Sequence, residues 1–359
     1  MKPFLAQFSI FRQKNIILKM GVAVLTIVLI QAMIFQNVQA DDTPQNFPTM
    51  PTADQSALPT PTPILKLIFP ETSSHPVSGW RPSLLPIPYA LGPYDHFYFA
   101  RPIAVTTVNW PLADYRYGYK DSETNTAHTG VDIDAQLHTP ILAAGDGKVV
   151  FTGYGLSLGG AKSTDPYGLA VMIRHDFSFE GRSIETVYAH MAEITVKVGD
   201  LVKTGDQLGY VGMTGNTTGP HVHFEVRLES PSGYLVQNPE LWMVPPTDDG
   251  VLLGIFVGNN GKYLSGKTVT VKNKATSKSW TVYTYFNPNM KRDPYFQENM
   301  VLSDLPKGDY TVTVYDNYKT SSFDVSISPG AITHIYYKTG KGFSLIDSTT
   351  QELSFLIPY

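Results

Sequence analysis

The sequence predicts a mainly β protein, with an antiparallel sheet domain over residues 121–247 and a small β-sandwich over residues 250–340. Three observations predict this class. Apolar runs rich in β-branched and aromatic residues recur through both regions. Gly-Asp pairs and other turn residues separate these runs at short intervals. No segment of residues 121–245 has the periodicity of a helix of normal length.

The first region contains strand-like runs separated by tight turns. Residues 148–151, 169–173 and 186–190 contain β-branched or aromatic residues and are predicted to be strands. Residues 196–209 hold two Gly-Asp pairs, in which glycine supplies a positive φ and the aspartate side chain closes the turn. We therefore expect a compact set of short strands there.

The second region has the same character with a different spacing. Its turn residues recur at short intervals, which is typical of a β-sandwich. The candidate strands are residues 251–257, 267–271, 279–285, 310–315, 323–327 and 333–337. Residues 305–314 resemble the tail of a carboxypeptidase-regulatory-like (prealbumin-like) domain. This resemblance implies a spacer or stability module, with adhesion to a wall polymer as the alternative.

The first forty residues have the pattern of an export signal. A basic start precedes an uncharged run from Met20 to Phe35, and Val38-Gln39-Ala40 offers a small-x-small cleavage site. The alternative is an uncleaved membrane anchor through residues 20–35, although this run is short for a bilayer span and Gln31 interrupts it. In both cases we expect the rest of the chain to lie outside the cytoplasm, secreted or at the cell surface.

Two segments separate this signal from the sheet domain. Residues 41–63 are rich in Pro and Thr, cannot bury a core and are predicted to form an extended linker. Residues 64–120 form an aromatic-rich N-terminal extension for which we predict little regular structure. This extension either wraps the next domain or forms one side of a substrate groove.

The charge and cysteine content exclude several functions. Charged residues make up 16% of the chain and the net charge is −4, although residues 1–40 contain four basic side chains and no acid. The body of the protein is therefore acidic, which argues against a nucleic-acid partner because phosphate binding needs clustered Lys and Arg. The chain has no cysteine, so it forms neither a disulfide nor a thiolate metal site.

Two histidines and an aspartate have the residue types and spacing of a metal site. His128 and Asp132 are four residues apart, and the β-branched residues around Gly130 favour a strand edge, on which positions i and i+4 share a face. His223 is the third expected ligand. Zinc accepts nitrogen and oxygen ligands, and three protein ligands with one open position indicate a hydrolytic centre rather than a structural one.

Two further histidines are candidates for proton transfer, because a neutral imidazole near an activated water can take or donate a proton. His221 shares a strand face with His223, and His190 lies on another strand. Tyr188 is expected to share a face with His190, with a site-lining role or a packing role. Glu225 is expected to point away from His223 with a supporting role. The other histidines that lack a partner motif are expected to be structural or surface residues: His75, His96, His175 and His334.

Three motifs occur in the order of a known family. His-x-Gly-x-Asp at 128–132, Tyr-x-His at 188–190 and Gly-Pro-His-x-His-Phe-Glu at 219–225 resemble the lysostaphin/LytM-type zinc metallopeptidases, which are secreted bacterial enzymes that cut peptide cross-links of peptidoglycan. The resemblance covers about residues 121–240. It implies one Zn²⁺ ion held by His128, Asp132 and His223, with His190 and His221 as catalytic histidines. It also implies a narrow groove along a central antiparallel sheet.

The sequence departs from the family pattern at several points. His138 stands where the family usually has glycine, and it is expected in the cleft rim or in a plain loop. Residues 154–167 and 176–184 are longer than the family minimum and are expected to rim the cleft, so bond specificity does not carry over. Some latent relatives block zinc with an upstream asparagine, a position that Asn109 or Asn125 could take.

The resulting hypothesis is a secreted zinc metalloendopeptidase that acts on peptidoglycan peptides. One alternative is a non-catalytic wall-binding or hydrolase-activator protein, but the chain keeps all five family positions. Another is a phosphocarrier with paired histidines, but the export signal argues against it and such a protein has no need of Asp132.

Overall fold

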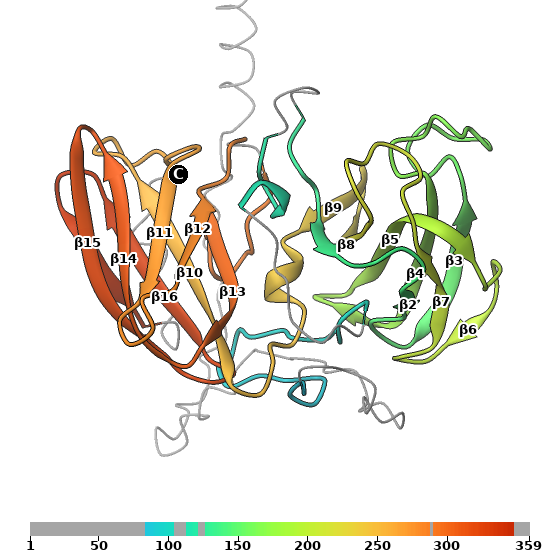
Figure 1. Cartoon of the computed structure of the whole chain (residues 1–359), viewed down its shortest axis with the longest axis horizontal. Helices are drawn as coiled ribbons and strands as arrows, with labels where there is room; N and C mark the ends of the chain where they lie inside the picture. Colours follow the sequence, from blue (N-terminus) through green and yellow to red (C-terminus); the bar gives the residue numbers. More distant parts are fainter. Residues whose placement is uncertain (1–82, 104–112, 121–125, 288–289, 348–359) are drawn as a thin grey trace, which may run out of the picture. The chain divides into compact units, whose positions relative to one another are not determined.

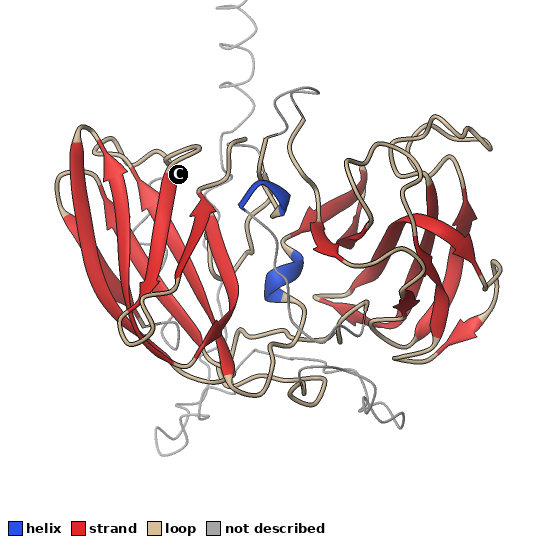
Figure 2. Ribbon diagram, in the orientation of Figure 1, coloured by secondary structure: helices blue, strands red, loops and turns tan. Residues whose placement is uncertain are grey.

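The computed structural model describes residues 83–103, 113–120, 126–287 and 290–347, all within one compact unit, residues 63–359. The predictions for residues 1–63 and for His75, Asn109 and Asn125 lie outside the described residues. Among the described residues, no helix is both long enough and apolar enough to span a bilayer. The predicted mainly β class is confirmed, since two single-turn 3-10 helices, η1 (Ala113–Tyr115) and η2 (Pro239–Leu241), interrupt a succession of strands (Figure 2).

The first region forms a nine-stranded antiparallel sheet (Figure 1). The main path of the sheet runs β1-β8-β5-β4-β3-β6, and β7 joins β2 to β5 while β9 pairs with β8. Its strands are β1 (Val131–Asp134), β2 (Pro140–Leu142), β3 (Gly147–Gly153), β4 (Leu169–Phe179), β5 (Arg182–Ile194), β6 (Leu201–Val202), β7 (Gln207–Val211), β8 (His221–Ser230) and β9 (Gly233–Gln237). Strand β8 therefore lies between β1, which carries Asp132, and β5, which carries His190.

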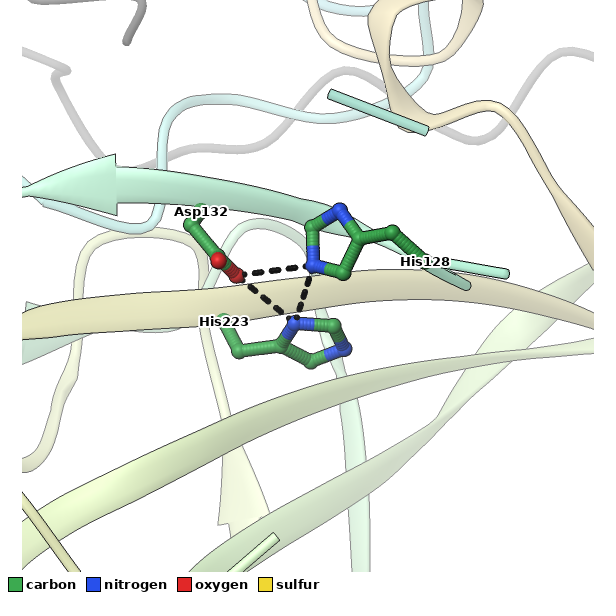
Figure 3. Close-up of side chains that lie close together, drawn as sticks. All are labelled: His128, Asp132 and His223. Atoms are coloured by element: carbon green, nitrogen blue, oxygen red, sulfur yellow. Dashed lines mark hydrogen bonds and ion pairs between the residues drawn. The ribbon is translucent and has the colours of Figure 1, made fainter. Parts of the chain in front are cut away.

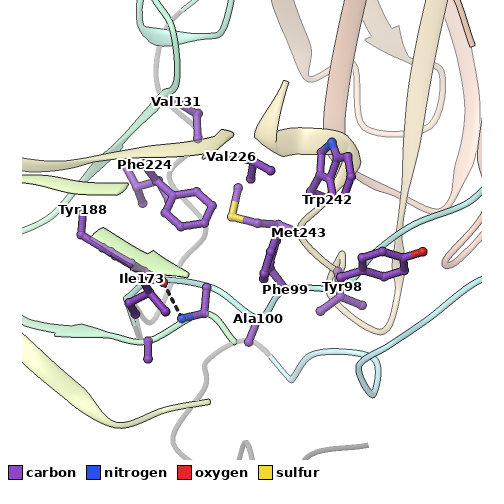
Figure 4. Close-up of a cluster of buried hydrophobic side chains, with 14 of the residues drawn as sticks. Tyr98, Phe99, Ala100, Val131, Ile173, Tyr188, Phe224, Val226, Trp242 and Met243 are labelled. Carbon is purple, nitrogen blue, oxygen red and sulfur yellow. Dashed lines mark hydrogen bonds between the residues drawn. The ribbon is translucent and has the colours of Figure 1, made fainter. Parts of the chain in front are cut away.

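One face of this sheet builds the main hydrophobic core (Figure 4). Alternate residues of β8, such as Phe224 and Val226, are buried there with Tyr188 of β5. The described part of the aromatic-rich extension wraps this core, since Phe99 is fully buried and its amide donates to the carbonyl oxygen of Trp242 at 3.0 Å. Full burial of such a side chain contributes about 1.5–3 kcal/mol, so the wrapping segment adds substantially to stability.

The second region forms two four-stranded sheets, ordered β13-β10-β16-β17 and β12-β11-β14-β15. Its strands are β10 (Asp249–Val257), β11 (Thr268–Asn273), β12 (Ser279–Tyr283), β13 (Met300–Pro306), β14 (Gly308–Asp316), β15 (Lys319–Ile327), β16 (Ile332–Lys338) and β17 (Gly342–Ile346). Strands β13 and β17 are absent from the sequence-based prediction. All residues of β13 but the last are buried, and β17 has no buried residue, so neither strand has the alternation of a half-buried strand.

Strand β10 has one face in each of two cores. Val251 and Leu253 belong to the main core under the first sheet. Leu252 and Phe256 belong to the core between the two four-stranded sheets. Because side chains alternate along a strand, this one element joins the two hydrophobic interiors.

Candidate functional site

The register between β1 and β8 brings the predicted site residues together. Asp132 lies directly opposite His223, and Asp134 lies opposite His221. The intervening residue Val222 is fully buried. If the β1–β8 pairing shifted by one residue, the side chains that face the core and those that face the site would change places, and apolar side chains such as Val222 would be exposed. Core packing therefore fixes which residues of β8 face the site.

His128 reaches the same point from outside the sheet, since it precedes β1 rather than lying on it. The expectation that His128 and Asp132 share a face of one strand is therefore wrong. The structure still brings the donor atoms together (Figure 3). The His128 Nε2 lies 3.0 Å from Asp132 Oδ1 and 3.0 Å from His223 Nδ1, and the latter lies 2.8 Å from Asp132 Oδ1.

The protonation of the two rings tests whether this group fits a cation. The His128 Nδ1 donates to the carbonyl oxygen of Arg116 at 3.1 Å, and the His223 Nε2 donates to Glu225 Oε1 at 3.0 Å. In the neutral rings, His128 Nε2 and His223 Nδ1 therefore carry no proton. Each of these nitrogens directs a lone pair toward the Asp132 carboxylate oxygen. Three acceptors within 3.0 Å repel one another unless a cation lies between them, so the donor set fits a divalent metal.

In the protein without an ion, a proton on His223 takes the place of the cation. Burial opposes a charge on His223, but the hydrogen bonds that the ring donates to Asp132 and Glu225 outweigh it and raise the pKa of the ring to about 9. Burial also opposes the charge on Asp132, yet His128 and His223 hold its pKa well below the usual value. The site is thus built to hold positive charge next to a carboxylate.

Glu225 belongs to the site, and the expectation that it points away from His223 is wrong. Residues two apart on a strand share a face, and Glu225 is fully buried on the site side of β8. It accepts bonds from Thr129, from the Tyr167 hydroxyl at 2.7 Å and from the Arg227 guanidinium at 2.6 Å. Burial raises the pKa of this carboxyl, but His223 and Arg227 more than reverse that effect and lower it to about 2.

His190 reaches the site because strand β5 is irregular at this position. Its φ is 60°, in the left-handed region, and the pairing of β4 with β5 shifts between Tyr188 and Met191. The His190 ring consequently lies 4.8 Å from that of His221 between centroids. The expectation that Tyr188 shares this face is wrong, because Tyr188 packs in the core against Phe224. Left-handed backbone at a non-glycine residue costs about 1–3 kcal/mol and is concentrated at functional sites.

Two backbone carbonyls orient the proton-transfer candidates. The His190 Nδ1 donates to the carbonyl oxygen of Thr214 at 2.8 Å, and the His221 Nδ1 donates to that of Gly219 at 2.8 Å. Burial lowers the pKa of both rings. For His190, burial together with the nearby His223 and His221 lowers the pKa to about 3. Both rings are therefore neutral at pH 7 and present an acceptor at Nε2. The His221 Nε2 lies 3.6 Å from Asp132 Oδ1, which is one of the three candidate metal-binding atoms.

The two long segments differ in their relation to the site. The first ends at Tyr167, whose ring centroid lies 5.7 Å from that of His223 and whose carbonyl oxygen accepts from the His190 amide at 2.9 Å. The second, residues 176–184, forms the tip of the β4–β5 hairpin, where Phe179 packs on Trp242 in the main core. The expectation that this second segment rims the cleft is therefore wrong.

Three of the remaining described histidines are buried, and the fourth is exposed. His175 is buried between the carbonyl oxygen of Asp146 and the Thr186 hydroxyl. His96 and His334 are buried as well, near the aromatic ring of Phe296. His138 is exposed with a φ of 63°, a conformation that glycine adopts without strain.

The residues that support the site are not among those predicted from the sequence: Thr129, Tyr167, Thr214 and Arg227. Arg227 could have been found from the two-residue spacing, since positions 221, 223, 225 and 227 share one strand face. Tyr167 and Thr214 lie in loops, and no spacing rule links them to β8.

Comparisons with known proteins find relatives of the region that contains this site. Residues 126–239 match the family model described as Peptidase family M23. The DD-carboxypeptidase/endopeptidase Mpg of Neisseria meningitidis is 35% identical over 147 residues, which cover 39% of this chain and 30% of that protein. The peptidoglycan DD-endopeptidase ShyA of Vibrio cholerae is 37% identical over 100 residues, covering 28% and 20%.

Among solved structures, the catalytic domain of the antimicrobial peptidase lysostaphin from Staphylococcus simulans is 30% identical, with a TM-score of 0.29. This match covers 35% of the present chain and 86% of the lysostaphin domain. The chain spans 30% or less of the length of the two curated relatives.

Proposed function

Because residues 126–239 form a domain of peptidase family M23, we propose that this protein is a zinc-dependent endopeptidase that hydrolyses peptide bonds in peptidoglycan cross-links. The observation that carries this proposal is the convergence of His128 Nε2, Asp132 Oδ1 and His223 Nδ1, with two neutral histidines beside them. The peptidoglycan endopeptidases among the relatives support the substrate class.

His128, Asp132 and His223 would hold the zinc ion. When bound, zinc supplies a Lewis acid that makes water more acidic and polarises the carbonyl group under attack. Glu225 keeps the Nε2 proton of His223 in place and so directs Nδ1 toward the metal position. The carbonyl oxygen of Arg116 does the same for His128.

His221 and His190 would move the protons at their Nε2 atoms. Because each Nδ1 is fixed as a donor to a backbone carbonyl, each neutral ring offers only Nε2 as acceptor. One ring takes the proton of the attacking water, and the protonated ring returns it to the leaving amine. The positive charge that a ring carries between these steps also stabilises the oxyanion of the tetrahedral species.

The location that fits this reaction is outside the cytoplasm, where peptidoglycan is accessible. The export pattern of residues 1–40 supports this location. N-terminal sequencing of the secreted protein tests whether these residues are cleaved off. A mature N-terminus at Asp41 is the expected result. An intact N-terminus in the membrane fraction would instead identify residues 20–35 as an anchor.

Digestion of purified peptidoglycan by the full chain tests the activity, with metal analysis of the same sample. We expect one zinc per chain and newly cleaved cross-link peptides in the mass spectrum. A chelator should abolish cleavage, and added zinc should restore it. His221→Ala should keep zinc but lower turnover by at least about 100-fold, the usual minimum for a general acid–base group.

Two outcomes would contradict the proposal. Full activity of His221→Ala would remove this residue from the reaction. Zinc binding by the wild-type protein without cleavage of any wall peptide would favour a non-catalytic wall-binding or hydrolase-activator function.

A further inference from the structure

The metal-ligand candidate His128 is held by a short segment outside the sheet, residues 113–120, which we call the strap. The His128 amide donates to the carbonyl oxygen of Tyr119 at 2.7 Å, and the Gly118 amide donates to that of His128 at 2.9 Å. The ring Nδ1 donates to the carbonyl oxygen of Arg116 at 3.1 Å. Three hydrogen bonds from the strap thus fix both the backbone and the ring of this residue.

The other side of the strap is bonded to the β-sandwich formed by β10–β17. The Phe286 amide, just after β12, donates to the carbonyl oxygen of Gly118 at 2.9 Å. The Tyr119 ring packs on Tyr283 and Phe286, with centroid distances of 5.7 and 5.2 Å. The same residues that hold His128 are therefore held by the sandwich.

A buried ion pair adds a second connection. The Arg116 guanidinium lies 2.5 Å from Glu240 Oε2, and both side chains are buried. The same oxygen accepts from the amide and the hydroxyl of Ser303 on β13, each at 2.9 Å. Arg116, whose carbonyl oxygen orients the His128 ring, is thus connected to strand β13 of the sandwich through one carboxylate.

Gly118 of the strap lies tightly against Tyr285, which follows β12 in the sandwich region. Its φ is +79°, and a Cβ atom added there would lie 2.5 Å from Cδ1 of Tyr285. Tyr285 cannot yield easily, because it is buried and its hydroxyl is bonded to Asn238 and Glu298. The strap fits between the metal-ligand candidate and the sandwich only with glycine at this position.

From these contacts we propose that the β-sandwich is a positioning element of the metal centre, acting on His128 through the strap. The inference rests on the proposed function only in taking His128 as a metal ligand. Groups that orient a ligand typically change metal affinity by 10- to 100-fold when they are removed. A domain that served only as a spacer or for wall adhesion would have no such effect.

Zinc affinity of full-length variants, measured by competition with a chromophoric chelator, tests this inference. Gly118→Ala should raise the zinc dissociation constant by about 10-fold or more, because it displaces the strap. Phe286→Ala keeps every backbone bond but removes packing on Tyr119, and should raise it by about 2- to 10-fold. Both substitutions lie outside the residues proposed to bind zinc or move protons.

Phe323→Ala is the matched control for Phe286→Ala. Phe323 is also a half-buried aromatic of the sandwich, stacked on Phe343 at 5.7 Å, and makes none of the strap contacts described above. It should lower thermal stability without changing zinc affinity. In zinc-free protein, the His128 amide should exchange hydrogen faster in Phe286→Ala than in Phe323→Ala.

The outcomes separate this inference from the proposed function. If wild-type protein binds zinc and all three variants match its affinity, the inference is overturned and the proposed metal site stands. Equal weakening by Phe286→Ala and Phe323→Ala would also overturn it, because the effect would then be general destabilisation. A wild-type protein that binds no zinc would overturn both proposals.

Discussion

His223 and His128 face the same carboxylate, but different kinds of structure hold them. His223 lies on β8, paired on both sides by β1 and β5, and its ring is bonded to the buried carboxylate of Glu225. His128 precedes the sheet, and backbone carbonyls of the strap hold its amide and its ring. One half of the site depends on sheet register, whereas the other depends on contacts between segments distant in the sequence.

Alanine at either histidine should have the largest effect on metal binding. Both His223→Ala and His128→Ala remove one of three donor atoms, so we expect zinc content below about a tenth of that of wild type. The two variants should differ in stability. His223→Ala leaves buried Glu225 without one partner and should lower the free energy of unfolding by about 1–3 kcal/mol.

His128→Ala should lower the free energy of unfolding by less, about 1 kcal/mol or under, because the ring is partly exposed and its bond is to a backbone carbonyl. Urea unfolding of zinc-free samples measures both values. A larger loss of unfolding free energy for His128→Ala than for His223→Ala would contradict the distinction between the strap-held and the sheet-held half of the site.

Glu225→Gln addresses the sheet-borne half without removing a donor atom. Glutamine keeps the shape but loses the charge that fixes His223 and neutralises Arg227. We expect zinc affinity to fall by about 10- to 100-fold. Glu229→Gln is the control, since Glu229 lies on the same strand and face but is exposed. Equal affinities of the two variants would exclude Glu225 as a positioning residue.

Tyr167→Phe should have a smaller effect on the same half. It removes the hydroxyl that donates to Glu225 and accepts from Arg227, but leaves the backbone bond to the His190 amide. Loss of one hydrogen bond of about 1 kcal/mol corresponds to a fall in zinc affinity of about 5-fold. Tyr154→Phe, in the same loop, should bind zinc as the wild type does. Isothermal titration of both variants provides the comparison.

Removal of zinc should give the smallest and most local difference between the two halves of the site, seen in the hydrogen exchange of their backbone amides. The His128 amide is bonded only to the strap, whereas His223 lies within a strand ladder on both sides. After treatment with a chelator, we expect exchange of the His128 amide to accelerate more than that of the His223 amide. Hydrogen-exchange mass spectrometry of overlapping peptides measures this, and the reverse order would contradict the assignment of supports.

The sequence predicted the sheet-borne half of the site and little of its support. Alternation along 221–225 places two histidines on one face, and a buried apolar set on the other face requires that arrangement. The position of His190 was predicted as a strand residue, but its left-handed φ depends on loop contacts through Tyr167 and Thr214. Such contacts leave no periodic signal in the sequence.

The strap was not predicted, for a similar reason. Its fit depends on the approach of Gly118 to Tyr285, residues far apart in the sequence. Strand β13 was missed because both of its faces are buried, which removes the alternation that marks a strand. The aromatic-rich extension was predicted to wrap the next domain or to line a groove, and its described part wraps the core.

The two-sided burial of β10 has a consequence for the history of this chain. Consider a gene rearrangement that joins the peptidase region to a new domain just before Asp249. It would remove the side chains of Val251 and Leu253 from the core beneath the first sheet. The peptidase region would then have a cavity in its core, and the separated β-sandwich would expose an apolar patch. We therefore expect the two regions to melt in a single calorimetric transition and to resist exchange as interchangeable cassettes.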